Sequence, residues 1–192
     1  MGVKIRDRDA TIKVKRTYYT PDGRELLLPM LNQGELVVCR LQLRSSKKVD
    51  NIAIVDMIPA GLEIENTRLN KASLNWVKGL AQARYMDARD DRAIYYTDMK
   101  ANQVKEFAYL MRAVSQGTFL LPPVAAEAMY DPEIHSFHSG DTLFIYPPKA
   151  ELPNHRLAPA KTVKPDDSTD SPCPKWVSPY STWARLRAKI QD

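Results

Sequence analysis

The chain has 192 residues and a formal net charge of +5, a length that suits one domain with a tail or two small domains. Basic and acidic residues alternate along most of it, and no basic stripe carries stacking aromatic residues, so nucleic-acid binding is not expected. No stretch is long and apolar enough for a direct membrane span, and no secretory signal is visible.

The first part of the chain is expected to form strands separated by turns. Apolar residues alternate over 10–20 and 35–45, which is the period of a strand with one buried face. The segment 24–30 contains a proline near its end and is expected at a sheet edge. The apolar run 51–57 predicts a short buried strand.

The strand at 35–45 carries the first of two cysteines. Val37, Cys39 and Leu41 share its inward phase, so Cys39 is expected to be a buried free thiol. The alternative is a disulfide between Cys39 and Cys173, if the compartment is oxidising. Two cysteines are too few for a disulfide scaffold or for a zinc site made of cysteine alone.

The middle of the chain is less regular. A short helix is expected over 71–77, with Trp76 packing it onto the sheet. Two further strands, 82–88 and 92–97, flank a turn rich in aspartate. The local backbone hydrogen bonds that aspartate makes in turns explain these carboxylates without catalysis.

The stretch 104–134 is expected to lie at the centre of the fold. Phe107, Tyr109 and Met111 alternate inward along its first strand. The expected order of segments is a strand at 104–113, a hairpin turn at 115–117, a return strand at 118–121, a break at Pro122-Pro123, a third strand at 124–130 and a last strand at 142–146.

These segments predict a mainly β protein, an antiparallel β-sandwich of immunoglobulin-like kind with one short helix, over residues 1–146. From 147 to 192 the chain becomes a proline-rich tail, expected to be flexible over 147–180, with a short helix at 181–190. The tail is either frayed or docks on a partner through its apolar side chains. The candidate partner-binding residues are Trp176, Trp183, Leu186 and Ile190.

Catalytic chemistry has little support in the sequence. His135, His138 and Asp141 have a spacing that can bind a metal, but no further ligand is apparent, so we interpret them as solvated loop residues. There is no nucleophile motif and no glycine-rich phosphate loop. We therefore expect no catalytic, cofactor-binding or metal-binding residue. A metal enzyme that uses the two histidines remains a minor hypothesis.

Three segments resemble a known family. They are VDMIPAGLEIEN at 55–66, MDARDDRAIYYTD at 86–98 and FAYLMRAVSQGTFLLPPVAAEAMYDPEI at 107–134. In this order and spacing they resemble the C-terminal macroglobulin-like domain of bacterial alpha-2-macroglobulins, over about residues 10–146.

The resemblance implies a role inside a larger protein. Its members are periplasmic, often anchored to the inner membrane, and are thought to trap proteases; many are encoded beside a peptidoglycan-synthesising protein. The expected partners are therefore other domains of the parent chain, target proteases and cell-wall-synthesis proteins. Some members carry a thioester made by a Cys-x-Glu-Gln motif, which this chain lacks. An adhesin-type or cell-wall-binding module is the alternative function.

Within the resembling segments, six residues are expected to have mainly structural roles. Arg112 is expected to pair with Asp56 or Asp131 across the sheet, and the Pro-Ala-Gly sequence is expected to turn the chain. The six residues are Asp56, Pro59, Gly61, Arg112, Gly117 and Tyr130.

Overall fold

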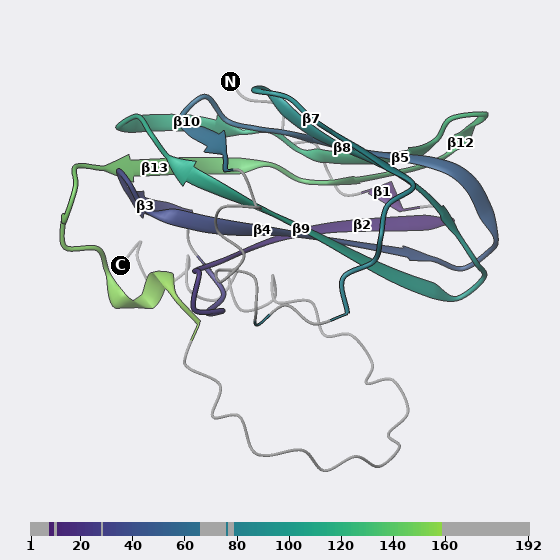
Figure 1. Cartoon of the computed structure of the whole chain (residues 1–192), viewed down its shortest axis with the longest axis horizontal. Coiled ribbons are helices and arrows are strands. Elements are labelled where there is room, and N and C mark those ends of the chain that lie inside the picture. Colours follow the sequence, from purple (N-terminus) through teal and green to yellow (C-terminus); the bar gives the residue numbers. More distant parts are fainter. Residues whose placement is uncertain (1–7, 10, 28, 66–75, 77–78, 159–192) are drawn as a thin grey trace, which may run out of the picture. The chain divides into compact units, whose positions relative to one another are not determined.

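The computed structural model describes residues 8–9, 11–27, 29–65, 76 and 79–158. Its strands form a six-stranded sheet above a four-stranded sheet, with a three-stranded sheet beside them (Figure 1). This confirms the predicted antiparallel β-sandwich. One strand pairing, between β13 and β3, is parallel.

The four-stranded sheet is built around the longest strands. Its order is β2, β4, β9, β6, with β4 paired to β9 over ten residues. The bounds are β2 Ile12–Tyr19, β4 Leu36–Ser45, β9 Gln103–Ala113 and β6 Leu62–Ile64.

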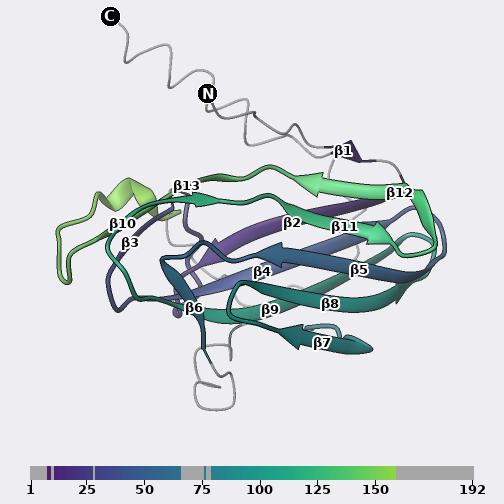
Figure 2. The same ribbon diagram turned by 90° about the horizontal axis from the view of Figure 1, so that it is seen from above.

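The six-stranded sheet faces it, and its strands lie side by side in Figure 2. Its order is β1, β12, β11, β5, β8, β7. The bounds are β1 Arg8–Asp9, β12 Asp131–His138, β11 Val124–Ala128, β5 Val49–Met57, β8 Arg92–Met99 and β7 Tyr85–Ala88.

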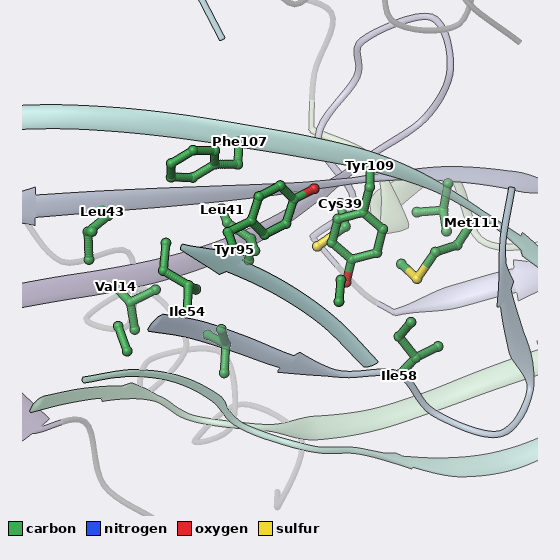
Figure 3. Close-up of a cluster of buried hydrophobic side chains, with 14 of the residues drawn as sticks. Val14, Cys39, Leu41, Leu43, Ile54, Ile58, Tyr95, Phe107, Tyr109 and Met111 are labelled. Atoms are coloured by element: carbon green, nitrogen blue, oxygen red, sulfur yellow. The ribbon is translucent and has the colours of Figure 1, made fainter. Parts of the chain in front are cut away.

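The core lies between these sheets. The predicted inward residues of β4 and β9, including Cys39, Phe107 and Tyr109, are buried, and Tyr95 from β8 packs against both aromatic rings (Figure 3). Val38 and Leu110 are buried as well, although they point to the other side of their sheet.

The predicted hairpin between 104–113 and 118–121 is wrong. The strand β10, Gly117–Leu121, leaves its predecessor and pairs with β13, Asp141–Tyr146, in the three-stranded sheet, whose third member is β3, Met30–Asn32. The loop before Gly117 therefore carries the chain from one sheet to another.

The pairs β10–β13 and β11–β12 form one long ribbon that is interrupted at the same level in both strands. Pro122-Pro123 separates β10 from β11, because proline has no N–H for the ladder. Opposite it, Ser139-Gly140 separates β12 from β13, between the pairs Leu121↔Asp141 and Val124↔His138. The predicted proline break is confirmed, and it has a partner in the facing strand.

Two other boundaries differ from the prediction. The third strand ends at Ala128 rather than 130, and the segment expected to be a loop with two histidines is the strand β12. The predicted helix at 71–77 lies outside the described residues except for Trp76, whose ring packs against Tyr19 in a tilted arrangement with 5.1 Å between centroids.

Residues 147–158, which the sequence assigns to the proline-rich tail, contact the sandwich in the structure. A single 3-10 turn, Asn154–Arg156, precedes Leu157, which bridges to Leu26. Arg156 donates to the carbonyl of Met30 at 2.7 Å and pairs with Glu35 at 3.0 Å. These contacts bind residues 147–158 to the loops around β3.

Candidate functional site

An ion pair joins the two large sheets in the core. Arg16 lies on β2 and Asp56 on β5, and Nη1 of the arginine is 2.5 Å from Oδ1 of the aspartate. Their side chains are only 2% and 1% exposed. A buried pair of charges is stable only when its remaining hydrogen-bonding atoms are also satisfied.

Neighbouring groups satisfy the rest of this pair. The hydroxyl of Tyr109 donates to Asp56 Oδ2 at 2.7 Å, and the thiol of Cys39 donates to the same oxygen at 3.3 Å. Nη2 of Arg16 donates at 2.6 Å to the carbonyl of Pro122, at the interruption between β10 and β11. Arg16, Cys39, Asp56, Tyr109 and the Pro122 carbonyl are called the core polar cluster below. The cluster ties the two large sheets to the proline break.

Burial sets the protonation states of the cluster. Removal from water, followed by the Asp56 charge, raises the pKa of both Cys39 and Tyr109 well above their ordinary values. Desolvation opposes the charge on Arg16, but the nearby Tyr18 and Asp56 outweigh it and raise the guanidinium pKa. The thiol and the phenol therefore stay protonated, and the cluster offers no nucleophile.

The identity of the charged partners corrects the sequence-based prediction. Asp56 pairs with Arg16, while Arg112 donates to Glu65 and to the carbonyl of Gly34. The sequence did indicate that Arg16 is buried, because the alternation that places Ile12 and Val14 on the inward face of β2 places Arg16 there as well. A charged residue in a buried phase predicts a buried partner, but it does not identify which one.

We predict that Cys39 is unreactive in the folded protein. In a Cys173→Ser background, iodoacetamide at pH 8 to 9 should label Cys39 only as fast as the protein unfolds, because the thiolate is the reactive form and burial suppresses it. Mass spectrometry of labelled peptides measures the rate. Labelling at the rate of a free exposed thiol would contradict the buried cluster.

The same shifts predict a loss of stability in alkali. A folded-state pKa above the unfolded value means that the folded state keeps a proton which the unfolded state releases. The free energy of unfolding should therefore fall as the pH rises above about 8.5, where unfolded cysteine ionises, and further above about 10 for tyrosine. Urea titrations at several pH values measure it, and a flat profile to pH 10.5 would contradict the shifts.

Pro59 and Gly61 form the crossing from β5 to β6. The amide of Leu62 donates to the carbonyl of Pro59 at 2.9 Å, which closes the turn. A Cβ on Gly61 would lie 2.4 Å from a ring carbon of Phe119 and 2.6 Å from Ile145 Cδ1. A side chain at position 61 would therefore have to displace the side chains of Phe119 on β10 and Ile145 on β13, which pack against the backbone of Gly61.

The other two motif residues differ from each other in setting. Gly117 has a φ of 144°, which favours glycine, at the start of β10. Tyr130 is 82% exposed and its neighbour Met129 is 52% exposed, at the tip between β11 and β12. Tyr130 is therefore not a core residue, and a structural role inside the sandwich does not account for it.

The two candidate metal-binding histidines lie on β12. The ring of His135 packs at a tilt against Phe137, and its Nδ1 contacts the carbonyl of Pro132 at 3.0 Å. Within the described ranges, no three histidine, cysteine, aspartate or glutamate side chains gather as a metal site would require. The candidate partner-binding residues Trp176, Trp183, Leu186 and Ile190 lie outside the described residues, as does Cys173.

No helix among the described residues is long and apolar enough to cross a membrane.

Comparison with known proteins places the chain in a family. Residues 12–133 match the model of the bacterial alpha-2-macroglobulin MG10 domain. The chain is 32% identical over 149 residues to alpha-2-macroglobulin of Escherichia coli K12, covering 71% of this chain and 9% of that protein. It is 31% identical to the alpha-2-macroglobulin of Xylella fastidiosa Temecula1, covering 66% of this chain and 8% of the relative.

Solved structures agree. The fold matches Escherichia coli alpha-2-macroglobulin activated by porcine elastase with a TM-score of 0.68 and 29% identity, over 73% of this chain and 14% of that one. The native conformation of the same protein gives a TM-score of 0.67 at 29% identity, over 74% and 10%. The chain thus spans about a tenth of the relatives it matches. It belongs to the bacterial alpha-2-macroglobulin family, in which it corresponds to the MG10 domain.

Proposed function

We propose that this chain is a non-catalytic domain of a periplasmic protease-trapping protein and that it acts by packing against neighbouring domains. The observation that carries this proposal is the tip between β11 and β12. Met129 and Tyr130 are exposed there, while β11 is paired on both sides and held rigidly by β5 and β12. A large apolar pair on a rigid support is typical of a protein contact.

The core supports the same role. The core polar cluster has no exposed nucleophile, and its hydrogen bonds fix β2, β5 and the proline break relative to one another. A domain locked in this way transmits a displacement at one surface to another, which suits a protein whose relatives were solved after activation by a protease. We place the parent protein at the inner membrane, with target proteases and cell-wall-synthesis proteins as its proposed partners.

The test uses Tyr130→Ala in the full-length protein and in the 192-residue chain. The free energy of unfolding of the chain should change by less than about 0.5 kcal/mol, because the side chain is exposed. In the full-length protein, the same variant should weaken inhibition of elastase acting on a protein substrate. Unchanged inhibition, or measurable proteolysis by the chain alone, would overturn the proposal.

A further inference from the structure

The outward face of the six-stranded sheet is apolar where a solvated face would be polar. In antiparallel sheets with one face in water, outward residues are usually polar. On β5 the outward positions are instead Ala53, Val55 and Met57, between the inward Ile52, Ile54 and Asp56. Because both faces of β5 carry apolar residues, the sequence 51–57 shows an apolar run without alternation.

Neighbouring strands extend the apolar face across the sheet. Directly paired residues in antiparallel strands project to the same side. Val55 pairs with Ile94 of β8 and Ala125 of β11, and Ala125 pairs with Phe137 of β12. In the next row Ala53 pairs with Tyr96, which pairs with Tyr85 at the sheet edge. The members of this apolar face are Ala53, Val55, Tyr85, Ile94, Tyr96, Ala125 and Phe137.

One carboxylate lies within this face. Glu127 of β11 is exposed and is flanked in its row by Ala53 and His135. It makes no hydrogen bond or ion pair with any residue that the structure describes. The carboxylates at the edge of the face differ, since Asp87 pairs with Arg89 and Asp98 pairs with Arg84.

The opposite surface of the domain shows what a solvated face looks like in this chain. The outward positions of β2 and β4 carry Lys13, Lys15, Arg40, Gln42 and Arg44, and Arg40 is paired with Glu106 of β9. Val38 and Leu110 lie on the same side of this sheet but are buried, so the exposed part of this face is mainly polar. The outward face of the six-stranded sheet is apolar by comparison.

We propose that the apolar face docks another domain of the same polypeptide, through apolar side chains that surround one lysine or arginine aimed at Glu127. Among the described side chains of this face, Glu127 is the one carboxylate without a partner, and it favours a docking surface that supplies a positive charge, because any other arrangement buries an unpaired carboxylate. The occupant is another part of the protein because the relatives that match this chain are about ten times its length. This inference rests on the proposed function, which it deepens by naming a second contact surface and its chemistry.

Hydroxyl-radical footprinting of the full-length protein and of the 192-residue chain tests the docking. In the full-length protein the oxidation rates of Tyr96 and Phe137 should be lower by a factor of roughly three or more, because an interface core excludes water. Val104, exposed on the four-stranded sheet, should be oxidised equally fast in both. Equal rates for Tyr96 and Phe137 in the two proteins would overturn the inference.

The charge is tested by reversal. Glu127→Lys in the full-length protein should restore the oxidation of Tyr96 to the rate seen in the 192-residue chain, whereas Arg44→Glu on the other outward face should leave Tyr96 protected. Protection of Tyr96 that survives Glu127→Lys would refute the role of the charge. Protection of Tyr130 without protection of Tyr96 would overturn this inference and leave the proposed function standing; protection of neither would overturn both.

Discussion

Replacing Asp56 by alanine should lower the free energy of unfolding by about 3 to 5 kcal/mol, the loss expected when one partner of a buried ion pair is removed. The variant leaves the Arg16 guanidinium in a site that is almost closed to water. It also removes the acceptor of Tyr109 and Cys39, whose hydroxyl and thiol would become buried donors without a partner. Urea unfolding of the 192-residue chain measures the loss.

The matched control is Asp91→Ala. Asp91 also pairs with an arginine, Arg92, at 2.5 Å, but the side chains of Arg92 and Asp91 are 39% and 53% exposed. Water screens such pairs, so the stability should change little. A difference between the two variants isolates the effect of burial from the loss of an aspartate–arginine contact.

A double variant separates the charge from the packing. Arg16→Met with Asp56→Ala should be more stable than the sum of the single losses predicts, because no uncompensated charge then remains in the core. A loss of under about 1 kcal/mol for Asp56→Ala, or strict additivity in the cycle, would show that the pair is not energetically coupled.

The sequence predicted which residues of a strand face the core better than it predicted which strands pair with each other. The inward sets of β4 and β9 follow from a period of two, which is a local property of the chain. The pairing of β10 with β13 joins residues twenty or more positions apart, and no local pattern encodes that choice. A turn sequence with glycine after β9 suggested a hairpin, but it serves a crossing between sheets.

The same distinction applies to the candidate sites. Asp56 was singled out within a motif and is buried, but its partner on β2 lies forty positions earlier in the chain. Tyr130 was interpreted as structural because it belongs to the motif that carries the family resemblance, yet its side chain is exposed. A motif indicates which residues matter to a family, while burial decides whether they serve the core or the surface.

Replacing Gly140 by alanine should destabilise the domain by roughly 3 kcal/mol, at the upper end of the usual cost of overpacking. A Cβ at this position would lie 2.1 Å from the carbonyl oxygen of Leu121 and 3.0 Å from the carbonyl carbon of Pro122. Both atoms belong to the backbone and cannot rotate away as the end of a side chain would. The variant must therefore separate the two strands at the interruption in the long ribbon.

The separation should also reach the core polar cluster. Arg16 donates to the carbonyl of Pro122, which is the residue that the new methyl group would displace. We expect the loss in Gly140→Ala and the loss in Arg16→Met to be less than additive when combined, because both variants disrupt the same contact. Full additivity would mean that the strand interruption and the cluster are independent.

Gly34→Ala supplies the control for this prediction. Gly34 has a φ of 89°, and no atom lies within 4 Å of the place that a Cβ would take, so alanine there meets backbone strain but no collision. Its cost should be about 1 kcal/mol. At Gly140 the situation is reversed, because the backbone conformation suits any residue but neighbouring backbone atoms occupy the place that a Cβ would take. A larger loss at Gly140 than at Gly34 would establish that close approach of the two interrupted strands, rather than backbone conformation, requires glycine at this point of the ribbon.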